Sequence, residues 1–200
     1  TATVFTFIFG IHPMSKLKDV GKTPSRVSNG YVWGMYQWTN HYARESDIHM
    51  WSKELSYSIS LIARHLRGLD FDLTDEKLSR KIRRRVTKYL KDECSVVLPC
   101  RWRENSPKFL LAVQISGVPQ DLLLKEVITT EGGIIELLGN RQQFIVAGTH
   151  PSGVRYQWEG LLDSVPTITY VQFRYLWDEI LQKEFGIVPV KKVKEIKELE

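Results

Sequence analysis

An alternating stretch of acidic and apolar residues, Leu69-Asp70-Phe71-Asp72-Leu73, constrains the fold of this 200-residue chain more than any other segment. In a β-strand, successive side chains point to opposite faces, so Asp70 and Asp72 would share one face of a sheet. The three apolar residues would then be buried on the other face. Two carboxylates side by side on a rigid strand repel each other, and a divalent cation such as Mg²⁺ relieves that repulsion. The segment alone fits an exposed strand with two solvated acids equally well.

The hydrophobic period changes directly after this stretch. Leu78, Ile82 and Val86 recur at helical spacing, which predicts a helix with Thr74 or Asp75 as its N-cap. Residues 74–91 contain eight Lys or Arg and two acids, a balance of +6, whereas the whole chain has a net charge of +5. Such a concentration of charge suits a polyanion, although a basic helix face can also be merely solvated. The residues that would contact nucleic acid are Arg83, Arg84, Arg85 and Lys88.

Several further segments have the pattern of β-strands. They are residues 57–63, 96–98, 109–115, 134–138 and 143–147, with a polar loop from Arg101 to Lys108 between the second and third. The last two predict a hairpin through a Gly139-Asn140 turn, with Glu136 paired to Gln143 and Leu138 paired to Arg141. Glu136 is then a lone acid in an apolar strand, so we expect a cation or a hydrogen-bond donor beside it.

The rest of the chain predicts one domain over residues 1–187. Thr169 and Gln172 have the spacing of a capping box at the start of a final helix, which ends at Gly186. Residues 188–200 alternate in charge and are expected to form a tail or a linker toward a further domain. The chain has no apolar run of about 18 residues, so no membrane contact is expected.

The two cysteines, Cys94 and Cys100, are too few for a four-cysteine zinc site, and no pair of histidines completes one. No zinc is therefore predicted. Both residues are expected to be small core residues in the reducing cytosol.

Taken in order, the motifs are more specific than each is alone. An Asp-x-Asp strand at residues 68–72 is followed by a helix, a basic loop, the acid of residues 135–137, and then by residues 143–153, which end in a His-Pro-Ser-Gly turn. This order resembles the primase-polymerase branch of the archaeo-eukaryotic primase superfamily, in the versions that phages and plasmids encode. The resemblance covers about residues 47–186. Many members carry a Ser-x-His element between the acids, where this chain has Ser106-Pro107-Lys108.

The resemblance implies an α+β fold, with an N-terminal α/β unit, an RRM-like antiparallel-sheet unit and the active site between them. It implies two Mg²⁺ or Mn²⁺ ions, held by Asp70, Asp72 and Glu136, which also makes these three the catalytic acids. The triphosphate would be bound by Lys108, Arg101, Arg103 and His150. His150 fits a turn residue bonded to the backbone equally well, and Tyr156 is expected in the core.

The main hypothesis is accordingly a template-dependent nucleotidyltransferase, a DNA primase, a DNA polymerase or both, in phage or plasmid DNA replication. Its expected partners are a single-stranded DNA template and nucleoside triphosphates, and also a helicase domain or a replisome protein, in the cytoplasm of a bacterial host. One alternative is a non-catalytic module that binds single-stranded nucleic acid on the same fold. Another is a metal-dependent nuclease, since that activity also uses clustered acids.

Overall fold

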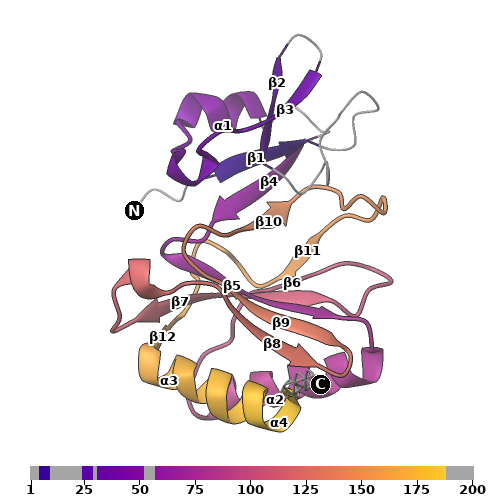
Figure 1. Ribbon diagram of the computed structural model, residues 1–200, viewed down its shortest axis with the longest axis vertical. Coiled ribbons are helices and arrows are strands. Elements are labelled where there is room, and N and C mark those ends of the chain that lie inside the picture. The colour runs from indigo at the N-terminus through magenta and orange to yellow at the C-terminus, as the bar shows by residue number, and fades with distance from the viewer. Residues whose placement is uncertain (1–4, 10–23, 29–30, 52–56, 188–200) are drawn as a thin grey trace, which may run out of the picture.

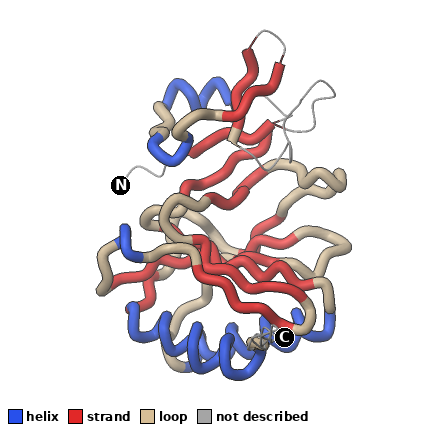
Figure 2. The backbone as a smooth tube through the Cα atoms, in the orientation of Figure 1, coloured by secondary structure: helices blue, strands red, loops and turns tan. Residues whose placement is uncertain are grey.

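The computed structural model describes residues 5–9, 24–28, 31–51 and 57–187, and it shows a mixed α+β fold built mainly from antiparallel strands. A smaller sheet lies above a larger one, and helices lie beneath the larger sheet (Figure 1). Figure 2 shows the same layers, with the C-terminal helices gathered at the base of the molecule. The α+β class predicted from the sequence is confirmed. Within the described ranges, every helix is too short or too polar to span a lipid bilayer.

The larger sheet has seven strands, with β5 (Leu66–Leu73) at its centre. Antiparallel partners flank β5 on both sides, β7 (Phe109–Ser116) on one and β9 (Gly133–Leu138) on the other. The strand order is β11-β6-β7-β5-β9-β8, and β12 pairs in parallel with the end of β7. The four remaining strands are β6 (Cys100–Trp102), β8 (Glu126–Thr130), β11 (Gln157–Glu159) and β12 (Thr167–Thr169).

Helix α2 (Glu76–Asp92) begins where the sequence predicts. The Asp75 carboxylate accepts hydrogen bonds from the backbone N–H groups of Lys77, at 2.7 Å, and Leu78, at 3.0 Å, so Asp75 rather than Thr74 is the N-cap. Ile82 and Val86 are fully buried against the sheet, which confirms the predicted apolar face.

The final helical segment also follows the prediction. Thr169 and Gln172 form a complete capping box before α3 (Tyr170–Arg174). The helix continues through the π-helical turns of η3 (Tyr175–Gln182) into α4 (Lys183–Phe185), and it ends at Gly186. The predicted tail, residues 188–200, lies outside the described residues.

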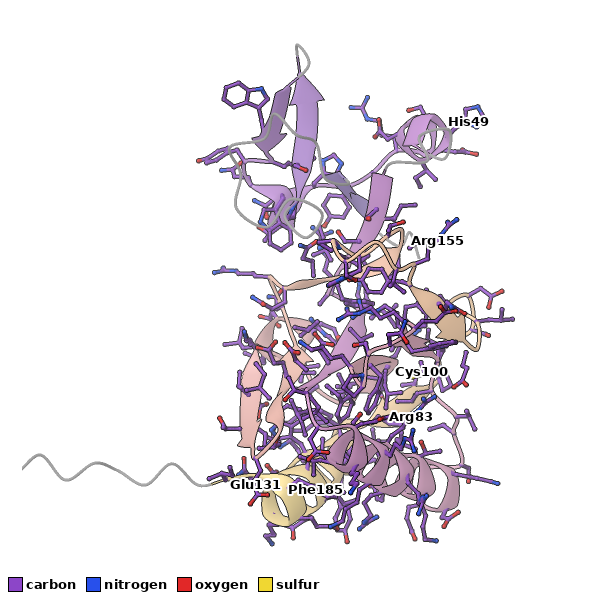
Figure 3. All side chains as sticks on the ribbon, turned by 90° about the vertical axis from the view of Figure 1, so that its right-hand side faces the viewer. His49, Arg83, Cys100, Glu131, Arg155 and Phe185 are labelled. Atoms are coloured by element: carbon purple, nitrogen blue, oxygen red, sulfur yellow. The ribbon has the colours of Figure 1, made fainter. Side chains whose placement is uncertain are left out.

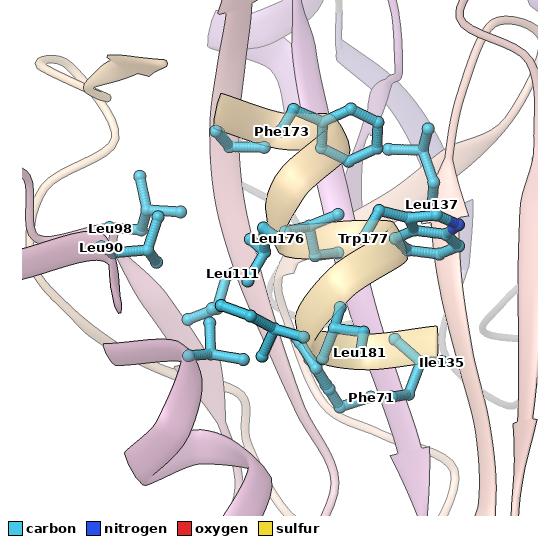
Figure 4. Packing of buried hydrophobic residues seen from close by; sticks show 14 of the residues in the cluster. Phe71, Leu90, Leu98, Leu111, Ile135, Leu137, Phe173, Leu176, Trp177 and Leu181 are labelled. Atoms are coloured by element: carbon cyan, nitrogen blue, oxygen red, sulfur yellow. The ribbon is translucent and has the colours of Figure 1, made fainter. Parts of the chain in front are cut away.

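The main core lies between the seven-stranded sheet and these helices. The three apolar residues of the alternating stretch have no exposed surface, and Phe71 stacks on Phe109 with ring centroids 4.2 Å apart. Figure 4 shows Trp177 of the final helix packed beside Leu137 of β9. Cys100 is buried in this core and Cys94 is half-buried beside it, and both thiols are free of disulfides.

The smaller sheet has the order β1-β4-β10 and is antiparallel. Its strands are β1 (Phe5–Phe9), β4 (Tyr57–Ile62) and β10 (Gln143–Ala147), so the predicted strand at residues 57–63 is confirmed. The upper part also contains the hairpin of β2 (Ser25–Ser28) and β3 (Tyr31–Gly34), with η1 (Trp38–Asn40) and α1 (Glu45–Trp51). A second apolar cluster joins the two sheets, with Leu61 and Phe144 from the smaller and Leu110 and Leu138 from the larger.

The predicted hairpin between residues 134–138 and 143–147 is wrong. Both segments are strands, but β9 pairs with β5 and β8, whereas β10 pairs with β4 in the other sheet. Neither Leu138–Arg141 nor Glu136–Gln143 is therefore a cross-strand pair. The physical reason is that β9 already has a partner on each edge, which leaves no place beside it for β10. The Gly139-Asn140 turn carries the chain from one sheet to the other instead.

The predicted strand at residues 96–98 is also wrong. The Val96 N–H donates to the Leu90 carbonyl at 3.0 Å, so this residue completes the end of α2 rather than a sheet ladder. The strand β6 begins only at Cys100. As a result Arg101, expected in a loop, lies on a strand of the larger sheet.

Candidate active site

The two acids of the alternating stretch lie on the face of the larger sheet that is opposite the helices. Their apolar neighbours Leu69, Phe71 and Leu73 are fully buried on the helix side, so strand alternation turns Asp70 and Asp72 toward the smaller sheet. The prediction that the two carboxylates share one face is confirmed.

Cross-strand register places three of the predicted site residues in one row. Asp70 lies directly opposite Glu136 of β9 and, on its other side, opposite Leu110 of β7. Leu110 in turn lies opposite Arg101 of β6. Residues directly opposed in antiparallel strands point to the same face, so Arg101, Asp70 and Glu136 all face the smaller sheet. Glu136 reaches this position through the β5–β9 pairing, not through the hairpin that the sequence suggested.

A recess of about 390 Å³ opens between the two sheets at this row. All seven residues predicted to bind metal or triphosphate line it, three acids, three strong bases and one histidine. They are Asp70, Asp72, Glu136, Arg101, Arg103, Lys108 and His150. The other walls are mostly apolar and come from β9, β10 and the segment before β11, namely Leu138, Gln143, Phe144, Ile145 and Tyr156. A mixed polar and apolar concavity of this size can enclose a small ligand.

Each of the three acids contacts a different cation. An Nη2 atom of Arg101 lies 3.7 Å from Asp70, and the Lys108 ammonium group contacts Asp72. The third pair joins Lys125 Nζ and a Glu136 carboxylate oxygen at 2.5 Å. The expected cation beside Glu136 is therefore present. Lys125 lies just before β8, and the sequence assigned it no role, because only the β8–β9 register brings it near Glu136.

Asp70 lines the recess, with 26% of its side chain exposed. Loss of solvation raises the pKa of Asp70, and the neighbouring charges of Asp72 and Glu136 raise it further, while Arg101 and Lys108 lower it. The net shift is upward, so the ionised form is less stable here than in water. A bound cation would offset this cost.

Arg101 also connects the two sheets. Its side chain is only 12% exposed, and Nη1 donates a hydrogen bond to the Ile145 carbonyl of β10 at 2.6 Å. The guanidinium lies over the Tyr156 ring, 4.7 Å from its centroid. Burial lowers the pKa of Arg101, and Asp70 opposes that shift. Tyr156, expected in the core, is half-buried and forms part of the recess wall.

Lys108 and His150 project from two anchored loops. The Ser79 hydroxyl of α2 donates to the Pro107 carbonyl at 2.5 Å, which fixes the backbone before Lys108. His150 lies in a tight turn in which its Nδ1 is 2.8 Å from the Ser152 hydroxyl and accepts from the Ser152 N–H at 3.1 Å. His150 therefore has the bonds of a turn residue, and it lines the recess as well.

The basic residues of α2 lie on the other side of the sheet. Arg83 pairs with Glu159, Arg85 with Glu184 at 2.8 Å, and Lys88 with Asp92 at 2.5 Å, while Arg84 is exposed. Figure 3 shows Arg83 in the lower layer with α2, and Arg155, beside the His150 turn, in the upper part. A ligand in the recess would not touch these helix residues.

The acids suit Mg²⁺ or Mn²⁺ in kind, because hard cations prefer oxygen ligands and Asp70, Asp72 and Glu136 supply only these. Their arrangement is not yet that of a metal centre. In the part of the chain that the structure describes, no three His, Cys, Asp or Glu side chains are grouped to hold an ion. Each of the three carboxylates instead contacts an Arg or Lys of the same chain.

Comparison with known proteins adds no relative, since no protein-family model matches the chain and no curated protein matches it either. The function is therefore inferred from the geometry of the recess and from the motifs of the sequence.

Proposed function

We propose that the recess is the active site of a template-dependent nucleotidyltransferase of the primase-polymerase type, a DNA primase, a DNA polymerase or both. One observation carries the proposal: three carboxylates and three strong bases from separate segments of the chain line a single recess. Phosphoryl transfer needs positioning and charge stabilisation more than covalent chemistry, and such a site offers both.

The acids and the bases would have separate roles. Asp70, Asp72 and Glu136 would hold two Mg²⁺ or Mn²⁺ ions, which would activate a 3′-hydroxyl and stabilise the leaving pyrophosphate. Lys108 and Arg103 would bind phosphate oxygens. Arg101 is already engaged by the Ile145 carbonyl and by Asp70, so its main role would be to neutralise Asp70 and hold the two sheets together.

The template would enter the recess only at the base that pairs with the incoming nucleotide, and the rest of it would lie outside. Nucleotides in the recess cannot reach α2, because the sheet lies between them, so the helix would contact only a strand that extends around the edge of the molecule. Arg83, Arg84, Arg85 and Lys88 are proposed as such a secondary contact.

A non-catalytic module for single-stranded nucleic acid is a second candidate. The observation that favours it is the pairing of every acid with a cation of the same chain, which neutralises the acids without metal. In such a module the bases of the recess would bind phosphate and the acids would only orient them.

Primer extension and primer synthesis with Mg²⁺ or Mn²⁺ test the proposal. We expect incorporation by the parent protein and none by the double variant Asp70→Ala/Asp72→Ala. Asp121→Ala, which removes an exposed acid of η2 (Gln120–Leu122), is the matched control and should behave as the parent does. Equal incorporation by the double variant and the parent would refute the active site.

The same assays separate the alternatives. Binding of single strands without synthesis under any metal would favour the binding module. Degradation of the template without added nucleotides, lost in the double variant, would instead favour a nuclease.

A further inference from the structure

Lys125 contacts the third acid of the recess from outside it. Its Nζ lies 2.5 Å from Oε1 of Glu136, but Lys125 is not among the residues that line the recess. It approaches from the β8 side of the sheet, whereas Arg101 approaches Asp70 from the β6 side. Across the sheet the charges therefore run positive, negative, negative, positive, and each of the two directly opposed acids has a cation on its outer side.

The backbone beside Lys125 is fixed where the chain leaves β9. The Asn140 N–H donates to the Leu123 carbonyl at 2.6 Å. Gly139 packs so closely there that a Cβ would lie 2.3 Å from the Leu123 carbonyl oxygen and from backbone atoms of Leu124, so only glycine fits. Lys125 follows directly and precedes the Glu126–Leu137 pair, so its side chain reaches Glu136 diagonally across the space between the two strands.

We propose that Lys125 neutralises the Glu136 carboxylate in the absence of metal and competes with a divalent cation for it. The inference rests on the proposed function in one respect, that a divalent cation binds to this acid cluster. When the cation arrives, Lys125 leaves Glu136, and its side chain, 44% exposed, turns to solvent. The free ammonium group is then hydrated, so its release costs little.

Lys108 and Lys125 differ in the partners that each can reach after release. Lys108 lines the recess, so after it leaves Asp72 it can bind a phosphate of the ligand. Lys125 lies outside and gains no new partner in the recess. Removal of Lys108 would therefore weaken nucleotide binding, whereas removal of Lys125 would only make Glu136 more available to the cation.

Mn²⁺ binding without nucleotide, followed by the paramagnetic signal of the unbound ion, tests this role. We expect Lys125→Met to bind Mn²⁺ about two- to fivefold more tightly than the parent, the range that a partly exposed ion pair supplies. Lys125→Arg keeps the positive charge and should bind as the parent does. Lys183→Met is the matched control, because Lys183 pairs with Glu179 on the final helix, away from the recess.

A second background shows whether the effect passes through Glu136. In Glu136→Gln the same Lys125→Met change should alter Mn²⁺ affinity by less than the factor seen in the parent. Urea unfolding midpoints of all variants confirm that each is folded. Equal or weaker Mn²⁺ binding by Lys125→Met would overturn the inference, as would an undiminished effect in the Glu136→Gln background.

The failure of this inference differs from the failure of the proposed function. If the parent binds Mn²⁺, Asp72→Asn abolishes binding and Lys125→Met changes nothing, the metal site stands and the role of Lys125 is wrong. If neither the parent nor Lys125→Met binds Mn²⁺, both are wrong.

Discussion

The two faces of the seven-stranded sheet use the same strands in opposite ways. On the helix side, Leu69, Phe71 and Leu73 are fully buried and stabilise the fold. On the recess side, Asp70 and Asp72 alternate with them, and burial raises the pKa of Asp70, which disfavours its ionised form. One strand thus combines residues that stabilise the protein with residues that a stable fold alone would not require. Such a contrast is typical of a functional site.

The Lys and Arg side chains on the two sides of the sheet also differ in their partners. The bases on the recess side approach the acids of the proposed active site. Those of α2 pair with Glu159, Glu184 and Asp92, which lie outside the recess. The density of positive charge along the sequence is greatest in α2, but the cations that meet a set of acids in a recess lie on other elements.

The largest effect is expected on the free energy of unfolding, which substitutions on the two faces of the sheet should change by different amounts. Phe71→Ala should lower the free energy of unfolding by about 3–5 kcal/mol, because it removes a fully buried ring that stacks on Phe109. Asp72→Asn, one residue away on the other face, should change it by less than about 1 kcal/mol, since its pair with Lys108 is partly exposed. Urea denaturation measures both. A loss of several kcal/mol in Asp72→Asn would contradict the division between the faces.

The next effect concerns nucleotide binding. Lys108→Met should weaken triphosphate binding at least about tenfold, because a charge-assisted bond to phosphate is lost, and should leave template binding nearly unchanged. Lys88→Met is the control, since Lys88 is an exposed lysine of α2. Isothermal titration with a nucleoside triphosphate compares them, and equal losses in the two variants would remove the distinction between recess and helix.

A smaller effect is expected for the basic helix. Replacement of Arg83, Arg84 and Arg85 with Gln should weaken single-strand binding and flatten its dependence on salt. Because Arg83 and Arg85 are each engaged by a glutamate, we expect the slope of log K against log salt to change by less than about 2, the value for three phosphate contacts. Titrations at several salt concentrations measure the slope, and an unchanged slope would mean that the helix face is merely solvated.

The smallest effect is expected at Cys100, the neighbour of Arg101 in β6, and it concerns the burial of the thiol on the helix side of the sheet. Burial raises the pKa of the Cys100 thiol to about 11, above the ordinary thiol value. The unfolded chain therefore loses this proton first, so stability falls as the pH rises toward 11 and is unaffected well below the ordinary thiol pKa. At pH 8 in a Cys94→Ser background, maleimide should label Cys100 only upon unfolding. Labelling at the rate of an exposed thiol would contradict the burial.

Local patterns predicted the elements that local physics decides. The spacing of Ile82 and Val86 predicted the buried face of α2, and the pair Thr74-Asp75 predicted its start, of which Asp75 is the N-cap. The alternation around Asp70 predicted both faces of β5. Each of these features depends on a single segment, so it can be predicted without knowledge of residues that are distant in the sequence.

The pairing of strands that are distant in the sequence was harder to predict from the sequence. The Gly139-Asn140 turn is compatible with a hairpin and with a crossing between sheets, and the choice is made by β5 and β8, which already occupy both edges of β9. Lys125 was missed for the same reason, because its contact with Glu136 follows from the β8–β9 register. The motif predicted that Glu136 belongs with Asp70 and Asp72, but it did not predict the β5–β9 pairing that places Glu136 opposite Asp70.

The central claim is that Glu136 completes a set of acids used for nucleotidyl transfer, and a single substitution tests it most directly. Primer extension with Mn²⁺ should compare the parent, Glu136→Gln, and Glu131→Gln, an exposed acid between β8 and β9. We expect Glu136→Gln to lose at least about 100-fold in incorporation while it stays folded, and Glu131→Gln to match the parent. Incorporation by Glu136→Gln within twofold of the parent would contradict the account.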